Sequence, residues 1–402
     1  MQSDEPAPLL AVEDLATSFP TPRGALRAVD GVSFTLAPSE ALGVVGESGS
    51  GKSVLVRTIM NILPRQAQIS PRSRILFEGA DVRDRRGAAA RHFWGAEVAM
   101  VFQDPMTSLN PVRTIGRQLT DPMRHHLGLG RRAANTRAAE LLAEVGINEP
   151  GRRLTQYPHE LSGGMRQRVM IGIALSCSPK LLIADEPTTA LDVTVQKEIL
   201  DLLARLRTEL RMAMILISHD LAVVAGRTDR TLVMYAGRMA EIGPTADLFR
   251  HTRHPYTAAL LRSTPRIDEP SHTPLEVIPG TAPDLVEPPA GCRFAPRCRH
   301  ARPQCQLADP PLVTDPPLGT DPPLGTDSPG TDDHAGGASE PAADAPPDHP
   351  HRYACFYPIG TAAGDRALAD NLAEGRTGTG LDLRAVTAGR DVDHSVLDRA
   401  VN

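Results

Sequence analysis

The stretch GESGSGKS at residues 46–53 decides the fold, because it matches the phosphate-loop pattern G-x-x-x-x-G-K-[ST]. An apolar run, LGVVG at 42–46, precedes it, and a helix-like stretch, VLVRTIM at 54–60, follows it. A strand before the glycines and a helix after them distinguish a phosphate loop from a chance glycine-rich turn. The sequence therefore predicts a nucleotide-binding α/β protein.

Each residue type in this phosphate loop suits a nucleotide. The glycines let the backbone turn and direct its N–H groups at phosphate oxygens. We expect Lys52 to neutralise the β- and γ-phosphates of ATP and the hydroxyl of Ser53 to bind Mg²⁺. The predicted nucleotide contacts are therefore Gly46, Glu47, Ser48, Gly49, Ser50, Gly51, Lys52 and Ser53.

A second apolar run, LLIADEP at 181–187, ends in the carboxylates of Asp185 and Glu186. Because the carboxyl ends of parallel strands meet at one edge of a sheet, we expect both acids beside the phosphate loop. Two adjacent acids repel each other unless a cation intervenes. Asp185 is therefore predicted in the Mg²⁺ shell, and Glu186 is predicted to be the base that polarises the attacking water.

Two more apolar runs bring polar side chains to the same edge. MILISHD at 214–220 leads to His219, which is expected to contact the γ-phosphate and the water. VAMVFQ at 98–103 closes on Gln103, which is expected to sense Mg²⁺ or the water. A histidine at a strand end is more often structural and a single glutamine is a weak signal, so both catalytic assignments depend on the preceding motifs.

The stretch LSGGMRQ at 161–167 best discriminates among phosphate-loop proteins. Ser162, Gly163 and Gly164 precede a helix, and a helix N-terminus is suited to binding an anion. Since the chain already has one phosphate loop, a second anion site is expected to serve the nucleotide of a facing subunit. This feature predicts a dimer.

The spacing of apolar runs from residue 10 to about 260 predicts an α/β fold with a largely parallel sheet. A mostly helical pattern between Gln103 and Asp185 indicates an inserted helical subdomain. Proline becomes frequent beyond residue 263, and TDPPLG is repeated at 314–319 and 320–325. We expect a disordered Pro/Asp-rich insert and a mobile tail with at most one weak helix, at 308–350 and 361–402 respectively.

The net charge, the length of the apolar runs and the cysteine count limit which environment and partners fit this chain. The chain has 402 residues with a net charge of −5, which leaves no electrostatic footprint for nucleic acid. No apolar run approaches the ~20 residues needed to cross a bilayer, and MQSDEPAPLL at the start is not a secretory signal. We therefore expect a cytosolic protein that contacts the membrane through a partner, with its five cysteines reduced.

The motifs GESGSGKS, VFQDP, LSGGMRQ, LLIADEP, TALD and ISHD, in this order, resemble an ABC transporter nucleotide-binding domain. The resemblance implies a domain at 8–260 with a RecA-like core, an antiparallel β subdomain and a helical subdomain. It implies two cassettes that close head to tail around two ATP molecules, so that Ser162, Gly163 and Gly164 cap the γ-phosphate of the facing cassette. It also implies Asp192 at the dimer interface and, by position alone, Phe19 stacked on adenine.

Three further stretches, FQDPMTSLNP at 102–111, YPHELSGGMRQRV at 157–169 and HPYTAALL at 254–261, are similar to ATP-binding subunits of oligopeptide and dipeptide importers. The resemblance implies an ATPase at the cytoplasmic face of the membrane that energises peptide uptake, with nickel or another small solute as the alternative cargo. The implied partners are two permease subunits, a related second ATPase subunit forming a heterodimer, and, indirectly, an extracytoplasmic solute-binding protein. One departure is Ser39 before Glu40, where this family usually has glycine.

Cys292, Cys298, Cys305 and Cys355 fit a four-cysteine extension of the same importers, which here occupies 261–307 and 351–360. Four thiolates suit an iron cluster or zinc, and their spacing does not decide between the two. The resemblance favours a [4Fe–4S] cluster, with zinc or no metal as the alternative. Since the sequence shows no electron partner, we expect the centre to be a structural clamp, whose loss by chelation or Cys298→Ser would lower the melting temperature without changing nucleotide affinity. The long insert costs only about 1 kcal/mol of closure entropy. Cys177 is expected to be a small buried apolar residue.

Two other function classes compete with this interpretation. A soluble ABC ATPase acting on DNA or ribosomes usually carries two cassettes, coiled coils or basic arms, whereas this chain has one cassette, no heptad run and a negative balance. Intact Glu186, His219, Lys52 and LSGGMRQ signature residues speak against a catalytically silent cassette that binds ATP and regulates a partner. Both are therefore less favoured than a transporter ATPase.

Overall fold

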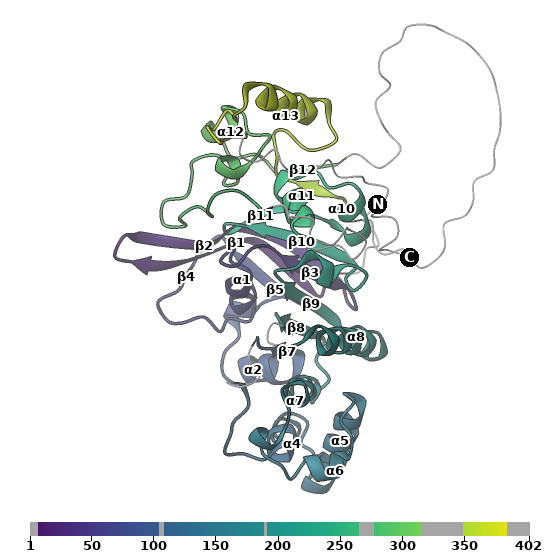
Figure 1. Ribbon diagram of the computed structural model, residues 1–402. Helices are drawn as coiled ribbons and strands as arrows, with labels where there is room; N and C mark the ends of the chain where they lie inside the picture. Colours follow the sequence, from purple (N-terminus) through teal and green to yellow (C-terminus); the bar gives the residue numbers. More distant parts are fainter. Residues whose placement is uncertain (1–6, 104–107, 189–190, 265–276, 316–348, 384–402) are drawn as a thin grey trace, which may run out of the picture.

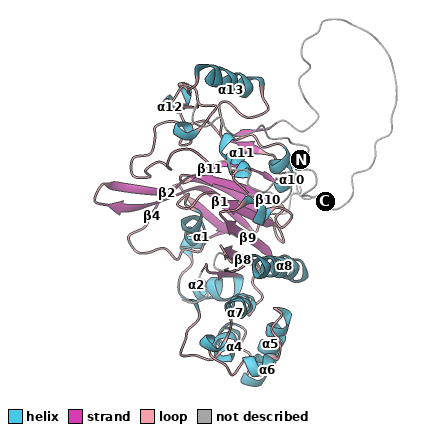
Figure 2. Ribbon diagram, viewed as in Figure 1, coloured by secondary structure: helices cyan, strands magenta, loops and turns pink. Residues whose placement is uncertain are grey.

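The computed structural model of the protein describes residues 7–103, 108–188, 191–264, 277–315 and 349–383. Among these residues, the strands form one sheet of eight and one of five. The strands fill the middle of the molecule, and helices surround them (Figures 1 and 2). This architecture confirms the predicted α/β class.

The larger sheet has the strand order β12-β13-β11-β10-β3-β9-β8-β7. Its parallel part consists of β10 (Arg230–Tyr235), β3 (Ala41–Val45), β9 (Ala213–Ser218), β8 (Leu181–Asp185) and β7 (Val98–Val101). Every residue of β3, β8, β9 and β10 is buried, as expected for parallel strands covered on both faces. Strand β11 (Arg238–Pro244) continues the sheet antiparallel to β10.

The smaller sheet is antiparallel and lies beside the larger one. Its strands are β1 (Leu10–Thr21), β2 (Gly24–Leu36), β4 (Gln68–Ile69), β5 (Arg74–Phe77) and β6 (Ala80–Asp81). The short turn at residues 22–23 joins β1 and β2 into a hairpin that projects from the molecule (Figure 1).

A helical subdomain is inserted between β7 and β8 and occupies the lower end of the molecule in Figure 1. It is built from α4 (Ile115–His126), α5 (Arg131–Glu144), α6 (Pro150–Arg153) and α7 (Gly163–Leu175). The predicted helical insertion between Gln103 and Asp185 is confirmed. A short helix α2 (Gly87–His92) and a π-helical turn (Phe93–Glu97) precede β7.

The remaining helices of the cassette flank the larger sheet. They are α1 (Lys52–Ile59), α8 (Val193–Leu210), α9 (Leu221–Val224), α10 (Thr245–Arg250) and α11 (Pro255–Arg262). Among all described residues, no helix combines the length and apolarity that crossing a membrane requires.

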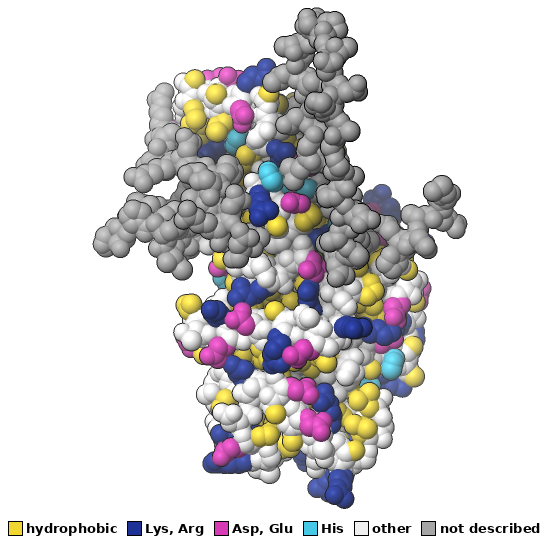
Figure 3. Space-filling model, turned by 90° about the vertical axis from the view of Figure 1, so that its right-hand side faces the viewer, with side chains coloured by type: hydrophobic (Ala, Val, Ile, Leu, Met, Phe, Trp, Pro, Cys, Tyr) yellow, Lys and Arg dark blue, Asp and Glu magenta, His cyan; other side chains and the backbone are white. Residues whose placement is uncertain are grey.

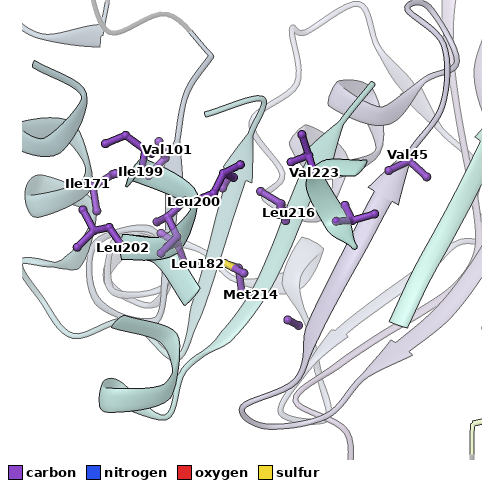
Figure 4. Close-up of a cluster of buried hydrophobic side chains, with 14 of the residues drawn as sticks. Val45, Val101, Ile171, Leu182, Ile199, Leu200, Leu202, Met214, Leu216 and Val223 are labelled. Carbon is purple, nitrogen blue, oxygen red and sulfur yellow. The ribbon is translucent and has the colours of Figure 1, made fainter. Parts of the chain in front are cut away.

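The core is divided by the larger sheet into two apolar clusters. Side chains that alternate along a strand point to opposite faces, so Leu182 joins one cluster while Ile183 joins the other. In Figure 4, Leu182 and Leu216 lie with Ile171 of α7 and Ile199 of α8. This packing ties the helical subdomain to the strands that carry the functional residues.

The C-terminal lobe, which we define as residues 277–315 and 349–383, lies against the edge of the larger sheet. It contains a 3₁₀ turn (Ala295–Arg297), α12 (Gln304–Leu307), β12 (Val313–Thr314), β13 (Arg352–Tyr353) and α13 (Ala362–Glu374). Strand β13 pairs with both β11 and β12, so the two halves of the lobe join in one sheet.

The structure differs from the expected tail at 361–402 over its described part. Helix α13 is docked, because the amide of the fully buried Asn371 donates hydrogen bonds to the carbonyls of Arg299 (2.8 Å) and Ala301 (3.1 Å). Most of the expected insert at 308–350 lies outside the described residues. Its first described part is held to the cassette by ion pairs, Arg238 with Asp309 and Arg253 with Asp315.

The departure at Ser39 is accommodated by the backbone. Ser39 has a φ of +64°, in the left-handed region where glycine is favoured, and its hydroxyl donates to the carbonyl of Arg211 at 2.9 Å. Glu40 accepts a hydrogen bond from the N–H of Ala37 at 2.6 Å and pairs with Arg230 at 3.0 Å. The turn that leads into β3 is therefore fixed at both residues.

Candidate nucleotide-binding site

The phosphate loop runs from the end of β3 to the start of α1, as the sequence indicated. Its glycines have positive φ values, +153° at Gly46, +79° at Gly49 and +101° at Gly51. A side chain on Gly51 would place its Cβ 2.2 Å from the carbonyl oxygen of Ala28, and one on Gly46 would lie 2.1 Å from that of Met234. Strands β2 and β10 therefore press on the loop and leave room only for glycine.

Lys52 is buried and its ammonium curls back over the phosphate loop. Its Nζ donates to the carbonyl oxygens of Gly46 (2.7 Å) and Glu47 (3.0 Å). Burial lowers the pKa of Lys52, while the charges of Glu186 and Asp185 oppose that shift. The hydroxyl of Ser50 is also buried and has no hydrogen-bond partner within the described residues. The ammonium of Lys52 and the hydroxyl of Ser50 could thus donate hydrogen bonds to phosphate oxygens.

The two predicted Mg²⁺ ligands lie together. The hydroxyl of Ser53 donates to Oδ1 of Asp185 at 3.0 Å, so α1 and the end of β8 meet at this point. Burial raises the pKa of Asp185, and the hydrogen bond from Ser53 and the charge of Arg57 counter it. A hydroxyl and a carboxylate are hard oxygen ligands, and Mg²⁺ commonly takes one or two such protein groups together with phosphates and water. The donor set therefore fits Mg²⁺.

Three predicted catalytic residues converge at the ends of β7, β8 and β9. Nε2 of Gln103 donates to Oε2 of Glu186 at 2.9 Å, and Nδ1 of His219 lies 3.6 Å from the same oxygen. Glu186 has a φ of +47°, a strained conformation for a residue with a side chain. Because the next element departs from the sheet here, the backbone turn directs this carboxylate toward Gln103 and His219.

The residues of the LSGGMRQ stretch lie at the N-terminus of α7. Ser162 caps this helix, since its Oγ accepts the N–H of Met165 at 3.4 Å, and both Ser162 and Gly163 are exposed. A side chain on Gly164 would contact Val195 at 3.1 Å, so this helix end lies against the start of α8. Asp192 caps α8 by accepting the N–H of Val195 at 3.0 Å. Thr189 and Ala190 of the TALD stretch lie outside the described residues.

Phe19 lies on β1, half buried, where it pairs with Leu26 of β2 in the projecting hairpin. Its proposed stacking on adenine stays a prediction.

Sequence reasoning missed two residues that hold the phosphate loop. The hydroxyl of the buried Tyr256 on α11 accepts the N–H of Glu47 at 2.8 Å. The guanidinium of Arg297 in the C-terminal lobe pairs with both carboxylate oxygens of Glu47, at 2.7 and 3.0 Å. HPYTAALL, which contains Tyr256, was a visible signal, whereas the position of Arg297 between two cysteines gave no indication of its partner.

The four cysteines of the extension line one small cavity, together with Phe294, Phe356 and Tyr357 among others. Burial raises the pKa of Cys292 to about 11 and also raises the pKa values of Cys298, Cys305 and Cys355. All four are free thiols. Yet within the described residues no group of three or more His, Cys, Asp or Glu side chains is arranged to share a metal ion. Cys177 is buried elsewhere, among core residues, as expected.

The fold and the converging side chains define an ABC-type ATPase cassette. Residues 29–189 match the family model for ABC transporters, and residues 240–305 match that for the oligopeptide/dipeptide transporter C-terminal region. The chain belongs to the ABC transporter family, in the group that carries this C-terminal region.

Proteins of known sequence and structure agree with this placement. Two Brucella abortus proteins provisionally named peptide import ATP-binding proteins are 48% and 50% identical over 317 and 306 residues, covering 76% of this chain in each case and 94% and 91% of theirs. A bacterial ABC transporter cassette solved as a dimer has 23% identity and a TM-score of 0.53, covering 59% of this chain and 98% of its own. A component of an ABC transporter complex of Clostridium perfringens has 27% identity and a TM-score of 0.53, covering 61% and 92%.

Proposed function

We propose that this chain is the ATP-hydrolysing subunit that energises uptake of oligopeptides or dipeptides through a membrane permease. The observation that carries the ATPase part is the convergence of Gln103 and His219 on the carboxylate of Glu186, beside a phosphate loop. The match of residues 240–305 to the oligopeptide/dipeptide transporter C-terminal region supports the peptide part.

In the proposed mechanism each group of the site acts on one part of ATP. Lys52 would bind the β- and γ-phosphate oxygens in place of the carbonyls of its own loop, and Ser53 and Asp185 would hold Mg²⁺. When bound, Mg²⁺ neutralises charge on those oxygens. Glu186 orients and polarises the attacking water, which Gln103 and His219 help to position. The short contacts among these three side chains keep them near one point before substrate arrives.

Two cassettes are required in this proposal. Ser162, Gly163 and Gly164 are exposed or half buried at a helix N-terminus, which favours binding of an anion from another molecule. They would cap the γ-phosphate held by the facing phosphate loop, and Asp192, close to that helix end, would lie in the same interface. Phe19 would stack on adenine. ATP binding would close the pair and hydrolysis would reopen it.

The proposed assembly places this chain at the cytoplasmic face of the membrane. It would comprise two permease subunits, a related second ATPase subunit and, indirectly, an extracytoplasmic solute-binding protein. On the face shown in Figure 3, basic and acidic side chains are interspersed over the described surface. A surface of mixed sign suits contact with proteins better than a nucleic-acid backbone, which selects clustered positive charge.

A metal centre at the four cysteines is the remaining part of the proposal. The four thiols line one cavity, soft sulfur suits an iron cluster or zinc, and the resemblance of the extension to that of oligopeptide importers favours a [4Fe–4S] cluster. Cys292, Cys298, Cys305 and Cys355 would hold it. Chain prepared without oxygen should contain iron and sulfide, Cys298→Ser should lose them, and Cys177→Ser should not. Zinc without sulfide would contradict this assignment.

The ATPase proposal is tested by turnover of the reconstituted transporter. Glu186→Gln keeps the shape of the side chain and its contact with Gln103 but removes the base, so ATP should still bind while hydrolysis falls by about 10²-fold or more. Rates equal to wild type would refute the assignment. Uptake by proteoliposomes carrying the permease and the binding protein should follow labelled peptide, and uptake of nickel without peptide would favour the alternative cargo.

A further inference from the structure

The phosphate loop is joined to the C-terminal lobe at Glu47. Its carboxylate forms a bidentate pair with Arg297, at 2.7 and 3.0 Å, and only 6% of the Arg297 side chain is exposed. Such two-pronged pairs fix orientation as well as charge. The partner residue belongs to the C-terminal lobe, 250 positions further along the chain.

The main chain of Glu47 is fixed as well. Its N–H donates to the hydroxyl of Tyr256, and the ring centroids of Tyr256 and Tyr235 are 4.5 Å apart. Tyr235 in turn receives a hydrogen bond from Arg297 at 3.2 Å. The N–H and the side chain of Glu47 therefore both bond to groups outside the phosphate loop, and the two anchors support each other.

Arg297 is itself held rigidly by the lobe. Its Nε donates to the carbonyl of Pro279 at 2.7 Å, and its own N–H bonds to the carbonyl of Phe294 at 2.9 Å. It lies between Cys292 and Cys298, the ends of a short loop that lines the cysteine cavity. The guanidinium therefore reaches Glu47 only while this loop keeps its fold.

We propose that Arg297 is a positioning residue for the phosphate loop, and that through it the C-terminal lobe controls nucleotide affinity. The physical reason is charge. Glu47 carries a carboxylate in a loop that must accept the negative phosphates of ATP, and a like charge nearby weakens their binding unless it is neutralised. The buried guanidinium of Arg297 neutralises this carboxylate, whose side chain is 28% exposed, and fixes its orientation through two hydrogen bonds. The lobe would then affect ATP binding as well as stability, unlike a purely structural clamp.

This inference rests on the proposed function, because it presumes that the chain binds ATP. The experiment measures the ATP dissociation constant, KM, kcat and the melting temperature of the full chain with its partner subunits. Arg297→Ala should raise Kd and KM on the order of tenfold with a smaller change in kcat, the loss of one charge-assisted contact. Arg297→Lys should recover part of the affinity, since it keeps the charge but not the fork.

The decisive variant is Glu47→Gln in the Arg297→Ala background. If the uncompensated carboxylate causes the loss, removing its charge should restore most of the ATP affinity, a result that simple unfolding of the lobe cannot give. Arg302→Ala is the matched control, because Arg302 lies in the same lobe but pairs with Asp370 and Asn371. It should leave Kd unchanged.

The outcomes separate the two proposals. Wild-type chain that does not bind ATP would refute the proposed function. Wild-type binding with an unchanged Kd in Arg297→Ala, equal losses in Arg297→Ala and Arg302→Ala, or no recovery on adding Glu47→Gln would each overturn the positioning role alone.

Discussion

Replacing Glu40 with alanine should destabilise the protein by about 3–5 kcal/mol, because it leaves the charge of Arg230 buried without its partner. The pair spans 3.0 Å, and only 6% of the Arg230 side chain and 8% of the Glu40 side chain are exposed. Glu40→Ala also removes the acceptor for the N–H of Ala37. The pair links β10 to the segment that leads into β3 and the phosphate loop, so Glu40→Ala should loosen this part of the sheet.

Burial, and not distance, sets this magnitude, and the chain offers a control. Lys180 and Glu78 approach more closely, at 2.7 Å, but their side chains are 49% and 45% exposed. Solvent screens such a pair, so Glu78→Ala should cost no more than about 1 kcal/mol. Urea unfolding followed by circular dichroism would measure both variants under the same conditions. Similar losses for Glu40→Ala and Glu78→Ala would refute the reasoning.

Three further predictions concern the site and its surroundings. Glu186→Gln should retain ATP binding in a filter assay and keep the two cassettes associated, because hydrolysis no longer reopens them; rapid dissociation with ATP would contradict it. Gly51→Ala should abolish measurable ATP binding, since its Cβ would lie 2.2 Å from the carbonyl oxygen of Ala28 at a φ of +101°; binding within twofold of wild type would contradict this. Burial lowers the pKa of His254 to about 4. The unfolded chain takes up that proton near pH 6.5, so the contribution is present at neutral pH and is lost as pH falls from about 6.5 toward 4, by roughly 3 kcal/mol in total. His254→Asn, which keeps an acceptor for the N–H of Tyr256, should flatten this part of the stability profile, whereas the exposed His251→Asn should not.

The local parts of the site could be predicted because short patterns encode them. A strand, a glycine-rich turn and a helix N-terminus lie within one stretch around residues 42–60. In the other apolar runs, the polar residue that follows indicates where the strand ends. For this reason the sequence could place Lys52 over the phosphate loop and Ser53 beside Asp185, where the structure has them, while their roles toward ATP and Mg²⁺ stay predictions. Parallel strands must also bring their carboxyl ends to one edge.

Helix α13 shows where sequence patterns mislead. Residues 361–402 contain few large apolar side chains, which indicated a mobile tail with one weak helix; a helix is present, capped by Thr361 and Gly375, but it is docked. Its docking depends on the buried hydrogen bonds of Asn371, and a polar residue gives no sign in the sequence that it will be buried. The cap residues predict a helix, whereas no sequence pattern predicts that the helix docks.

The sequence by itself determined the elements of the site: a phosphate loop, carboxylates at strand ends and a helix end predicted to bind a second anion, each encoded by residues near one another in the chain. Only the tertiary structure decided that Gln103 and His219 both face one carboxylate oxygen of Glu186, and that Arg297 pairs with Glu47 from 250 positions away. The physical reason is that backbone conformation and the spacing of buried apolar residues are local properties of a sequence. Which distant charges meet depends on the packing free energy of the whole chain, so no single segment predicts these pairs.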